Sequence, residues 1–312
     1  MSKIKNIAIK YNDKTYNGDA RLKGDRIIHF EKKNTTSYKI ELDKENYIFG
    51  LKKFSIQKPS IRNYVHEWIF HELANEFGII KLTYKFVQLY VNGEKHGLFV
   101  VEEGFGKELI ERNKRRNGPI FGLNEDLNYS NINPVFEIYN KKFWNRPENE
   151  PTALIASQKL RDFFDKKIKL DEVFDLDKWA SYFAIIDLTG TWHGALLKSV
   201  KFYYNPINGL FEPIPFDGHR FKPNYKKFNL KYDNKLVIDF INNLTEEDKK
   251  IGLGWLKGFF YNNDELNQEF YDLYVEKLTK ISSEDFIRNF LDKNLKTIKK
   301  INSHIYRDSF WF

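Results

Sequence analysis

The chain lacks cysteine and contains no run of a dozen consecutive apolar residues. Without cysteine, disulfide bonds, thiolate nucleophiles and thiolate metal ligands are all excluded. A membrane-spanning helix needs about 20 predominantly apolar residues, so the sequence predicts a soluble protein with no membrane span. Residues 1–10 alternate charged and apolar side chains and lack the continuous apolar core of a signal peptide, which predicts a cytoplasmic location.

Acidic residues are the minority among the charged ones. The 312 residues include 51 Lys and Arg against 43 Asp and Glu, which gives a formal net charge of +8. A positively charged surface can bind nucleic acid. The basic residues are scattered, however, and the densest cluster, at 112–116, is short. A phosphorylated or acidic glycan substrate would use the same surface, so nucleic-acid binding is not expected.

Residues 201–220 are the most informative segment and read KFYYNPINGLFEPIPFDGHR. Two aromatic-rich runs flank residues 205–209, which predicts a β-hairpin whose second strand leads to Asp217. Gly218 lets the chain turn away directly after this carboxylate. An aspartate at the end of a strand is suited to hold a metal ion. A plain Asp-Gly turn with a solvated carboxylate would explain the same residues.

The first hundred residues predict a sheet with one helix. Residues 37–42 alternate in the strand pattern and place Lys39 on the face opposite Tyr38, Ile40 and Leu42. Residues 60–78 have helical periodicity and carry Glu67. The strands predicted at 86–91 and 97–101 are joined at Asn92-Gly93, a strong hairpin signal. A lysine-bearing strand followed by a glutamate-bearing helix is typical of the small lobe of a kinase.

Taken in order, these segments resemble the CotH kinase family, which is named for bacterial spore-coat proteins with an atypical protein-kinase-like fold. The resemblance implies an α+β, two-lobe fold with a β-rich small lobe at 1–104 and a mostly α large lobe at 105–312, with an irregular insertion at about 111–151. The matching pieces are R-L-K-G-D at 21–25, S-Y-K-I-E-L at 37–42, H-E-W-I-F-H-E-L at 66–73, L-Y-V-N-G-E-K-H-G-L-F at 89–99, and K-F-Y-Y-N-P with E-P-I-P-F-D-G within 201–218.

The resemblance implies a nucleotide site in the small lobe. Lys39 would reach the nucleotide phosphates and Glu67 would pair with it, as an ammonium aimed by a helix-borne carboxylate. Lys23 and Gly24 would form the turn over the phosphates, with Arg21 as a supporting cation. A surface lysine, a surface glutamate and an ordinary β-turn are the alternative interpretations of these residues.

The resemblance also implies which residues would contact adenine and which would hold the metal ion. Glu102 and Glu103 would lie at the hinge between the lobes, where adenine meets backbone groups. Asp217 would hold Mg²⁺, or Mn²⁺, on the phosphates of ATP.

The predicted catalytic loop departs from the family pattern. In residues 190–194, His193 stands where the family has its catalytic Asp, 24 residues before Asp217. Ser199, or Lys198, stands where the family has a metal-binding Asn. With an unperturbed pKa of about 6.5, a histidine can act as a general base, although a hydrogen-bonded structural histidine is an alternative. Asp187 could orient His193, act as the base itself, or cap a helix end.

Three functions remain open on the sequence. The first is an ATP- and Mg-dependent phosphotransferase that moves the γ-phosphoryl group to a hydroxyl of a protein or a glycan. The second, favoured by His193 and Ser199, is a pseudokinase or nucleotide-binding scaffold without turnover. The third is a hydrolase whose transition metal is held by His193, Asp217 and His219. Relatives in the family are often exported or located in the spore coat, and the sequence identifies neither the acceptor nor the oligomeric state.

Overall fold

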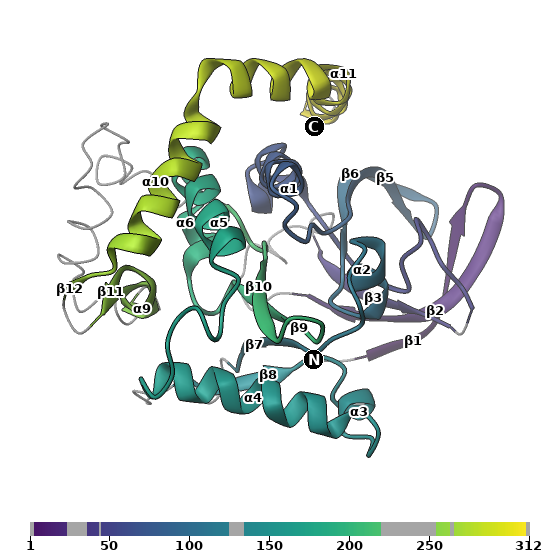
Figure 1. Ribbon diagram of the computed structural model, residues 1–312. Coiled ribbons are helices and arrows are strands. Elements are labelled where there is room, and N and C mark those ends of the chain that lie inside the picture. The colour runs from purple at the N-terminus through teal and green to yellow at the C-terminus, as the bar shows by residue number, and fades with distance from the viewer. Residues whose placement is uncertain are drawn as a thin grey trace.

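The computed structural model describes residues 3–23, 36–43, 45–124, 134–219, 254–262 and 265–309. Gly24, predicted to lie in the turn over the phosphates, falls outside these residues. The described chain is mixed α+β, with a curled antiparallel sheet built by its first part and helices that dominate its second part (Figure 1). None of the helices among these residues has the length and apolar character to cross a bilayer.

The larger sheet has six antiparallel strands in the order β1-β2-β3-β4-β6-β5. Helix α1 (His66–Glu76) follows β4 in the chain and precedes β5. The strands are β1 (Lys3–Tyr11), β2 (Lys14–Leu22), β3 (Tyr38–Leu42), β4 (Lys53–Gln57), β5 (Tyr84–Val91) and β6 (Glu94–Glu103).

Local sequence explains these elements. In β3 the buried Ile40 and Leu42 alternate with exposed Lys39, because successive side chains of a strand point to opposite faces. The predicted β5–β6 hairpin is confirmed, with Asn92 and Gly93 both at positive φ, as the tight turn requires. The helix predicted over 60–78 is shorter, because a 3-10 turn at Pro59–Arg62 precedes α1.

A smaller antiparallel sheet has the order β10-β9-β7-β8. Its central hairpin, β9 (Lys201–Asn205) and β10 (Leu210–Ile214), is the one predicted from the sequence. The insertion predicted as irregular at about 111–151 is in part regular, since it contains β7 (Ile120–Leu123), β8 (Phe136–Ile138) and the short helix α3 (Lys141–Trp144). The surrounding Asn, Pro and Gly residues obscure the pattern of these short strands in the sequence. The strands form by pairing, β7 with β9 and β8 with β7.

The helical part is built around α5 (Leu176–Thr189). Asp175 caps its first turn by accepting a hydrogen bond from the Lys178 backbone, and Gly190 ends it at φ +65°. The other helices of the described residues are α2 (Lys107–Arg112), α4 (Glu150–Phe164), α6 (Trp192–Ala195), α9 (Lys257–Phe260), α10 (Gln268–Ser282) and α11 (Glu284–Ser309). Two short strands, β11 (Tyr261–Asn262) and β12 (Glu265–Leu266), pair with each other after α9.

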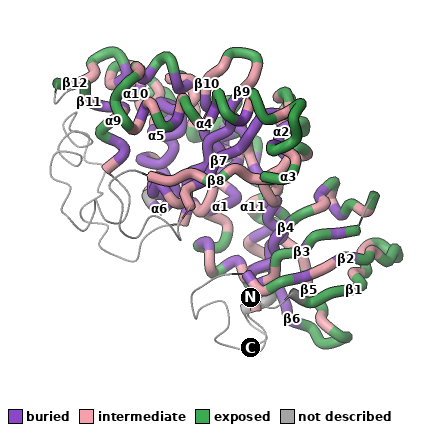
Figure 2. The backbone as a smooth tube through the Cα atoms, turned by 90° about the horizontal axis from the view of Figure 1, so that it is seen from below, coloured by how far each residue is buried: buried purple, intermediate pink, exposed green. Residues whose placement is uncertain are grey.

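The main core lies between α5 and the smaller sheet and is rich in aromatic side chains. Trp179 of α5 is fully buried and donates a 2.8 Å hydrogen bond from Nε1 to the carbonyl oxygen of Phe211 in β10. Its ring also packs against Phe174, Phe202 and Phe259. Buried residues are concentrated in this core, whereas most residues of the β1–β2 hairpin are exposed or half-buried (Figure 2). Helix α5 is therefore fixed to β10, the strand that leads to Asp217.

Helix α11 links the end of the described chain to its beginning. Phe286 packs on Phe77 just after α1, and Lys293 forms an ion pair with Glu76. Further along, Ile301 is buried in a cluster with Trp68 of α1 and residues of β5 and β6. In Figure 1, α11 accordingly passes beside α1. The contact buries one face of α1 and sets the position of the helix that carries Glu67.

Candidate functional site

Asp217 lies three residues beyond β10, where the chain passes close to α1. Its backbone is in the left-handed region, with φ +61°, and its side chain is only 15% exposed. Gly218 follows because there is no room for a side chain: a Cβ there would be 2.3 Å from the ring of Phe70. The close contact of Gly218 with α1 holds the Asp217 carboxylate at the junction between the two sheets and α1.

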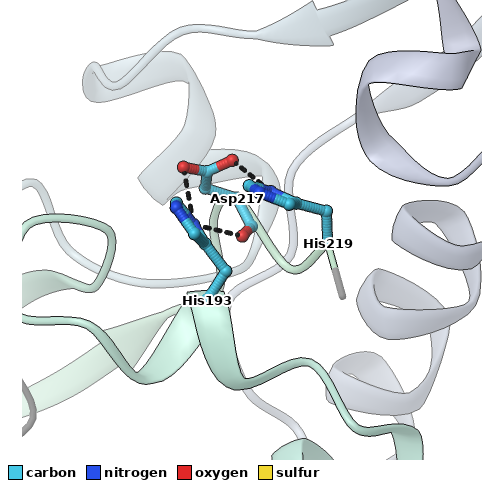
Figure 3. Close-up of side chains that lie close together, drawn as sticks. All are labelled: His193, Asp217 and His219. Atoms are coloured by element: carbon cyan, nitrogen blue, oxygen red, sulfur yellow. Dashed lines mark hydrogen bonds and ion pairs between the residues drawn. The ribbon is translucent and has the colours of Figure 1, made fainter. Parts of the chain in front are cut away.

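Two imidazoles converge on the Asp217 carboxylate (Figure 3). Nδ1 of His193, from α6, lies 2.9 Å from Oδ2, and Nδ1 of His219 lies 2.9 Å from Oδ1. The two rings lie close together, with centroids 3.8 Å apart and planes tilted by 32°. Ser199 Oγ donates to Oδ2 at 3.3 Å and lies 3.1 Å from His193 Nδ1. The structure thus brings together His193, Ser199 and Asp217, as the sequence predicted, with His219 beside them.

A guanidinium also binds this carboxylate. Arg62, at the end of the 3-10 turn before α1, forms an ion pair with Oδ1 of Asp217. The next two residues, Asn63 and Tyr64, both have positive φ, so the chain reverses sharply at this point. Sequence reasoning missed Arg62, because no local motif marks it and its partner is far away in the chain. Its place directly before the predicted Glu67 helix is the one signal that could have drawn attention to it.

The cations determine the ionisation of the site. Burial by itself would raise the pKa of the Asp217 carboxyl, but Arg62 and hydrogen bonds from His193 and His219 hold it well below its usual range. Burial also opposes the charge of Arg62, yet Asp217, Glu102 and Glu67 raise its pKa. Burial lowers the pKa of His193 in spite of Asp217. At neutral pH the site therefore contains an ionised carboxylate, a charged guanidinium and a neutral His193.

A second ion pair lies next to the first. Lys23, directly after β2, contacts Glu102 of β6 at 2.5 Å, and both side chains are buried. Burial lowers the pKa of Lys23, whereas Lys23 and Arg62 lower the pKa of Glu102 against the effect of burial. The ammonium of Lys23 and the guanidinium of Arg62 both lie about 6 Å from the ring of Phe216, at 6.0 and 5.7 Å. Two predicted nucleotide residues, Lys23 and Glu102, thus contact each other directly.

Lys39 and Arg21 are opposite each other in the β2–β3 register. Lys39 retains an exposed surface, but partial burial and the nearby charges of Arg21 and Lys23 lower its pKa. These three cations therefore lie close enough to repel one another. A polyanion would relieve this repulsion.

Glu67 is predicted to pair with Lys39, but no ion pair joins the two within the described residues. Its carboxylate is completely buried and lies 3.5 Å from His71, and neither oxygen has a hydrogen-bond partner among the described residues. The cation whose pKa it raises is Arg62. The structure therefore associates Glu67 with the charge network of Arg62 and leaves Lys39 with Arg21.

Glu103 and Asp187 have structural partners. Glu103 accepts a 2.8 Å hydrogen bond from the Thr83 backbone and forms an ion pair with Arg112, which joins β6 to α2. Asp187 accepts a hydrogen bond from Tyr274 of α10. Burial raises the pKa of Asp187 to about 7, although the tyrosine hydroxyl opposes the shift. Asp187 thus faces α10, and its carboxyl connects two helices of the core.

The donor atoms around Asp217 fit a divalent cation. One ligand atom each from His193, Asp217 and His219 can be chosen so that all lie within 4.8 Å of one another. The carboxylate and the Ser199 hydroxyl are oxygen donors, which Mg²⁺ prefers. The imidazoles are nitrogen donors, which suit Mn²⁺, Co²⁺ and Zn²⁺.

Comparison with known proteins gives one positive result. A family model described as CotH kinase protein matches residues 20–310. A search among curated proteins finds no match. The matched range includes both ion pairs, His193, Ser199 and Asp217, and it covers nearly the whole sequence. The chain belongs to the CotH kinase family.

Proposed function

We propose that the chain is an ATP-dependent phosphotransferase that needs Mg²⁺ or Mn²⁺ and moves the γ-phosphoryl group to a hydroxyl of a protein or a glycan. In this proposal residues 1–104 are the small lobe of a protein-kinase-like fold and residues 105–312 are the large lobe. The observation that supports it most directly is the buried, ionised carboxylate of Asp217 beside several cations, in a chain of the CotH kinase family.

The phosphates of ATP are assigned to the cations at the ends of β2 and β3. Burial lowers the pKa of Lys39, and the nearby charges of Arg21 and Lys23 lower it further, so these cations repel one another in the absence of an anion. A triphosphate would neutralise them and so bind more strongly than to an isolated lysine. The backbone at Glu102 and Glu103 is assigned to adenine, while the Glu102 side chain keeps Lys23 in place.

Asp217 and Ser199 would hold a divalent ion, which would supply positive charge to offset the negative charge of the phosphates. His193 is assigned to the acceptor hydroxyl. The hydroxyl oxygen bonds to the γ-phosphorus while the bond to the bridging oxygen of ADP breaks, and the imidazole takes the hydroxyl proton. A neutral imidazole can accept a proton, so the lowered pKa of His193 supports this assignment.

A nucleotide-binding scaffold without turnover is the second candidate. One observation favours it: Arg62 already neutralises Asp217, and His193 and Ser199 are engaged with the same carboxylate. A site saturated by its own side chains can bind a nucleotide and yet hold no acceptor in a reactive geometry.

Calorimetric titration with a non-hydrolysable ATP analogue tests the proposal, with and without Mg²⁺ or Mn²⁺. Asp217→Asn keeps the shape of the side chain but removes the charge, so metal-dependent binding should be lost. Asp177→Asn, at an exposed carboxylate on α5, is the matched control and should bind like the wild type. Unchanged metal-dependent binding by Asp217→Asn would refute the proposal. Binding without phosphoryl transfer to any added acceptor would favour the scaffold.

A further inference from the structure

The imidazoles beside Asp217 set this site apart from a magnesium site made only of oxygen atoms. We infer that His193, Asp217 and His219 together bind a divalent transition metal through two nitrogen atoms and one carboxylate. The inference deepens the proposed function, because it names the ion that the same carboxylate would hold. It also applies to the protein without nucleotide, where it can be tested separately.

The geometry is close to that of a bound ion. Metal–ligand bonds of about 2.0–2.2 Å in a tetrahedral site leave neighbouring ligand atoms roughly 3.3 Å apart. Nδ1 of His193 lies 2.9 Å from Oδ2 of Asp217 and Nδ1 of His219 lies 2.9 Å from Oδ1, and one ligand atom from each residue can be chosen so that all three lie within 4.8 Å of one another. A side-chain shift of roughly 1 Å would bring them to the spacing of a tetrahedral site. Two separate segments, α6 and the residues after β10, contribute these nitrogens (Figure 3).

Stabilisation of the carboxylate alone does not require both imidazoles. Arg62 already supplies a full positive charge to Oδ1, the same oxygen that His219 contacts. His219 therefore adds a second donor to an oxygen whose charge is already compensated. With a metal present, Nδ1 of each ring would give its lone pair to the ion, and the ring would carry its proton on Nε2 instead. His193 would then be a ligand in the metal-bound state and could accept a proton only when it is not bound to the ion.

The donor set favours a transition metal over Mg²⁺. Mg²⁺ requires near-octahedral oxygen coordination, and this site offers it one carboxylate and the hydroxyl of Ser199. Imidazole nitrogen is a good ligand for Mn²⁺, Co²⁺ and Zn²⁺, and for a given nitrogen site the affinity rises toward the later metals.

An ion bound beside Oδ1 would repel the Arg62 guanidinium and favour its movement away from that oxygen. The structure provides an acceptor for it. Within the part of the chain that the structure describes, both oxygens of Glu67 and Nε of Arg62 are buried without a hydrogen-bond partner. Metal binding would thus exchange the Arg62–Asp217 pair for an Arg62–Glu67 pair and leave every charge in the cluster compensated.

The test uses the full chain, stripped of metal with a chelator and titrated with Co²⁺ while the visible absorption spectrum is recorded. Co²⁺ bound to nitrogen gives d–d bands that report the ligand set without any assay of activity. We expect one Co²⁺ per chain, and a loss of affinity of about tenfold or more in His219→Gln. His304→Gln, which removes an imidazole on α11, should bind Co²⁺ like the wild type. Circular dichroism and thermal unfolding establish that each variant is folded.

The outcomes separate this inference from the proposed function. Equal Co²⁺ affinity in the wild type and His219→Gln would overturn the inference. So would displacement of Co²⁺ from the wild type by equimolar Mg²⁺, a measurement that needs no variant. Magnesium-dependent binding of the ATP analogue without any Co²⁺ site would leave the proposed function intact and remove the inference. A Co²⁺ site in a protein that does not bind the ATP analogue would support the inference and refute the proposed function.

Discussion

The aromatic core around α5 and the ionic cluster around Asp217 are both buried, but they are stabilised in different ways. The core consists of large apolar rings that exclude water, and almost any ring that fills the space contributes. In the cluster, Lys23, Arg62, Glu102 and Asp217 each depend on a charged partner from another segment. Burial of unpaired charge is costly, so each pair is sensitive to the loss of one member. The core therefore provides stability, and the cluster provides a specific arrangement of charge.

The largest effect on stability is expected in the core. Trp179→Ala would leave a large cavity and remove the hydrogen bond to Phe211, at a cost of about 3–5 kcal/mol in the free energy of unfolding. Denaturant unfolding measures this cost. Ile207→Ala, at an exposed side chain in the β9–β10 turn, is the control and should change stability by less than about 0.5 kcal/mol. A small loss for Trp179→Ala would mean that α5 is not the centre of the core.

Asp187 is an ionisable carboxyl buried in the apolar region, and we expect stability to depend on pH because of it. With its pKa raised from 3.8 to about 7, the folded chain keeps a proton that the unfolded chain has already lost. Stability should therefore fall as the pH rises from about 4 to about 7, by at most roughly 4 kcal/mol. Asp187→Asn still accepts from Tyr274 and should lose this slope. A slope that persists unchanged in Asp187→Asn would assign it to other groups.

Arg62→Gln breaks the cluster and should have an intermediate effect. Asp217 would remain buried without its strongest partner, but two imidazoles would still donate to it, so we expect a cost of about 3 kcal/mol in water without metal. In the same variant Co²⁺ should bind more tightly, because its competitor is gone. Lys293→Gln, which breaks the exposed pair with Glu76, serves as the control and should leave stability close to that of the wild type. Weaker Co²⁺ binding in Arg62→Gln would contradict the exchange of partners.

Lys39→Ala should have the smallest effect on the fold, because its side chain is partly exposed and has no ion pair with Glu67 in the described structure. If Lys39 contacts phosphate, affinity for the ATP analogue should fall about tenfold, which corresponds to about 1.4 kcal/mol. Lys52→Ala, another lysine in the first part of the chain, is a control for the loss of positive charge. Wild-type affinity in Lys39→Ala would remove Lys39 from the site and leave Arg21 and Lys23 as the phosphate cations.

The features that the sequence predicted correctly are those with a local cause. Asn92-Gly93 and the aromatic runs on either side of residues 205–209 mark hairpins by turn chemistry and alternation alone. The position of Asp217 beyond β10 follows from the second of these. The β1–β2 hairpin was not predicted, although Asn12 and Asp13, both at positive φ, carry a comparable turn signal.

The parts that escaped prediction depend on segments that are distant in the sequence. Arg62 meets Asp217 because the segment after β10 passes close to α1, and no spacing rule connects the two positions. The separation of Glu67 from Lys39 likewise follows from how α1 lies against β5 and β6. Family resemblance suggested the residues of the site, but their pairing is set by tertiary structure.

The contact between Gly218 and Phe70 places a restriction on how this site can diverge. A Cβ at position 218 would come within 2.3 Å of the aromatic ring, so a side chain can appear there only if the residue at position 70 becomes smaller. Among related chains, the two positions are therefore expected to covary: glycine after the aspartate with a bulky residue on the helix, or a larger residue with a small one.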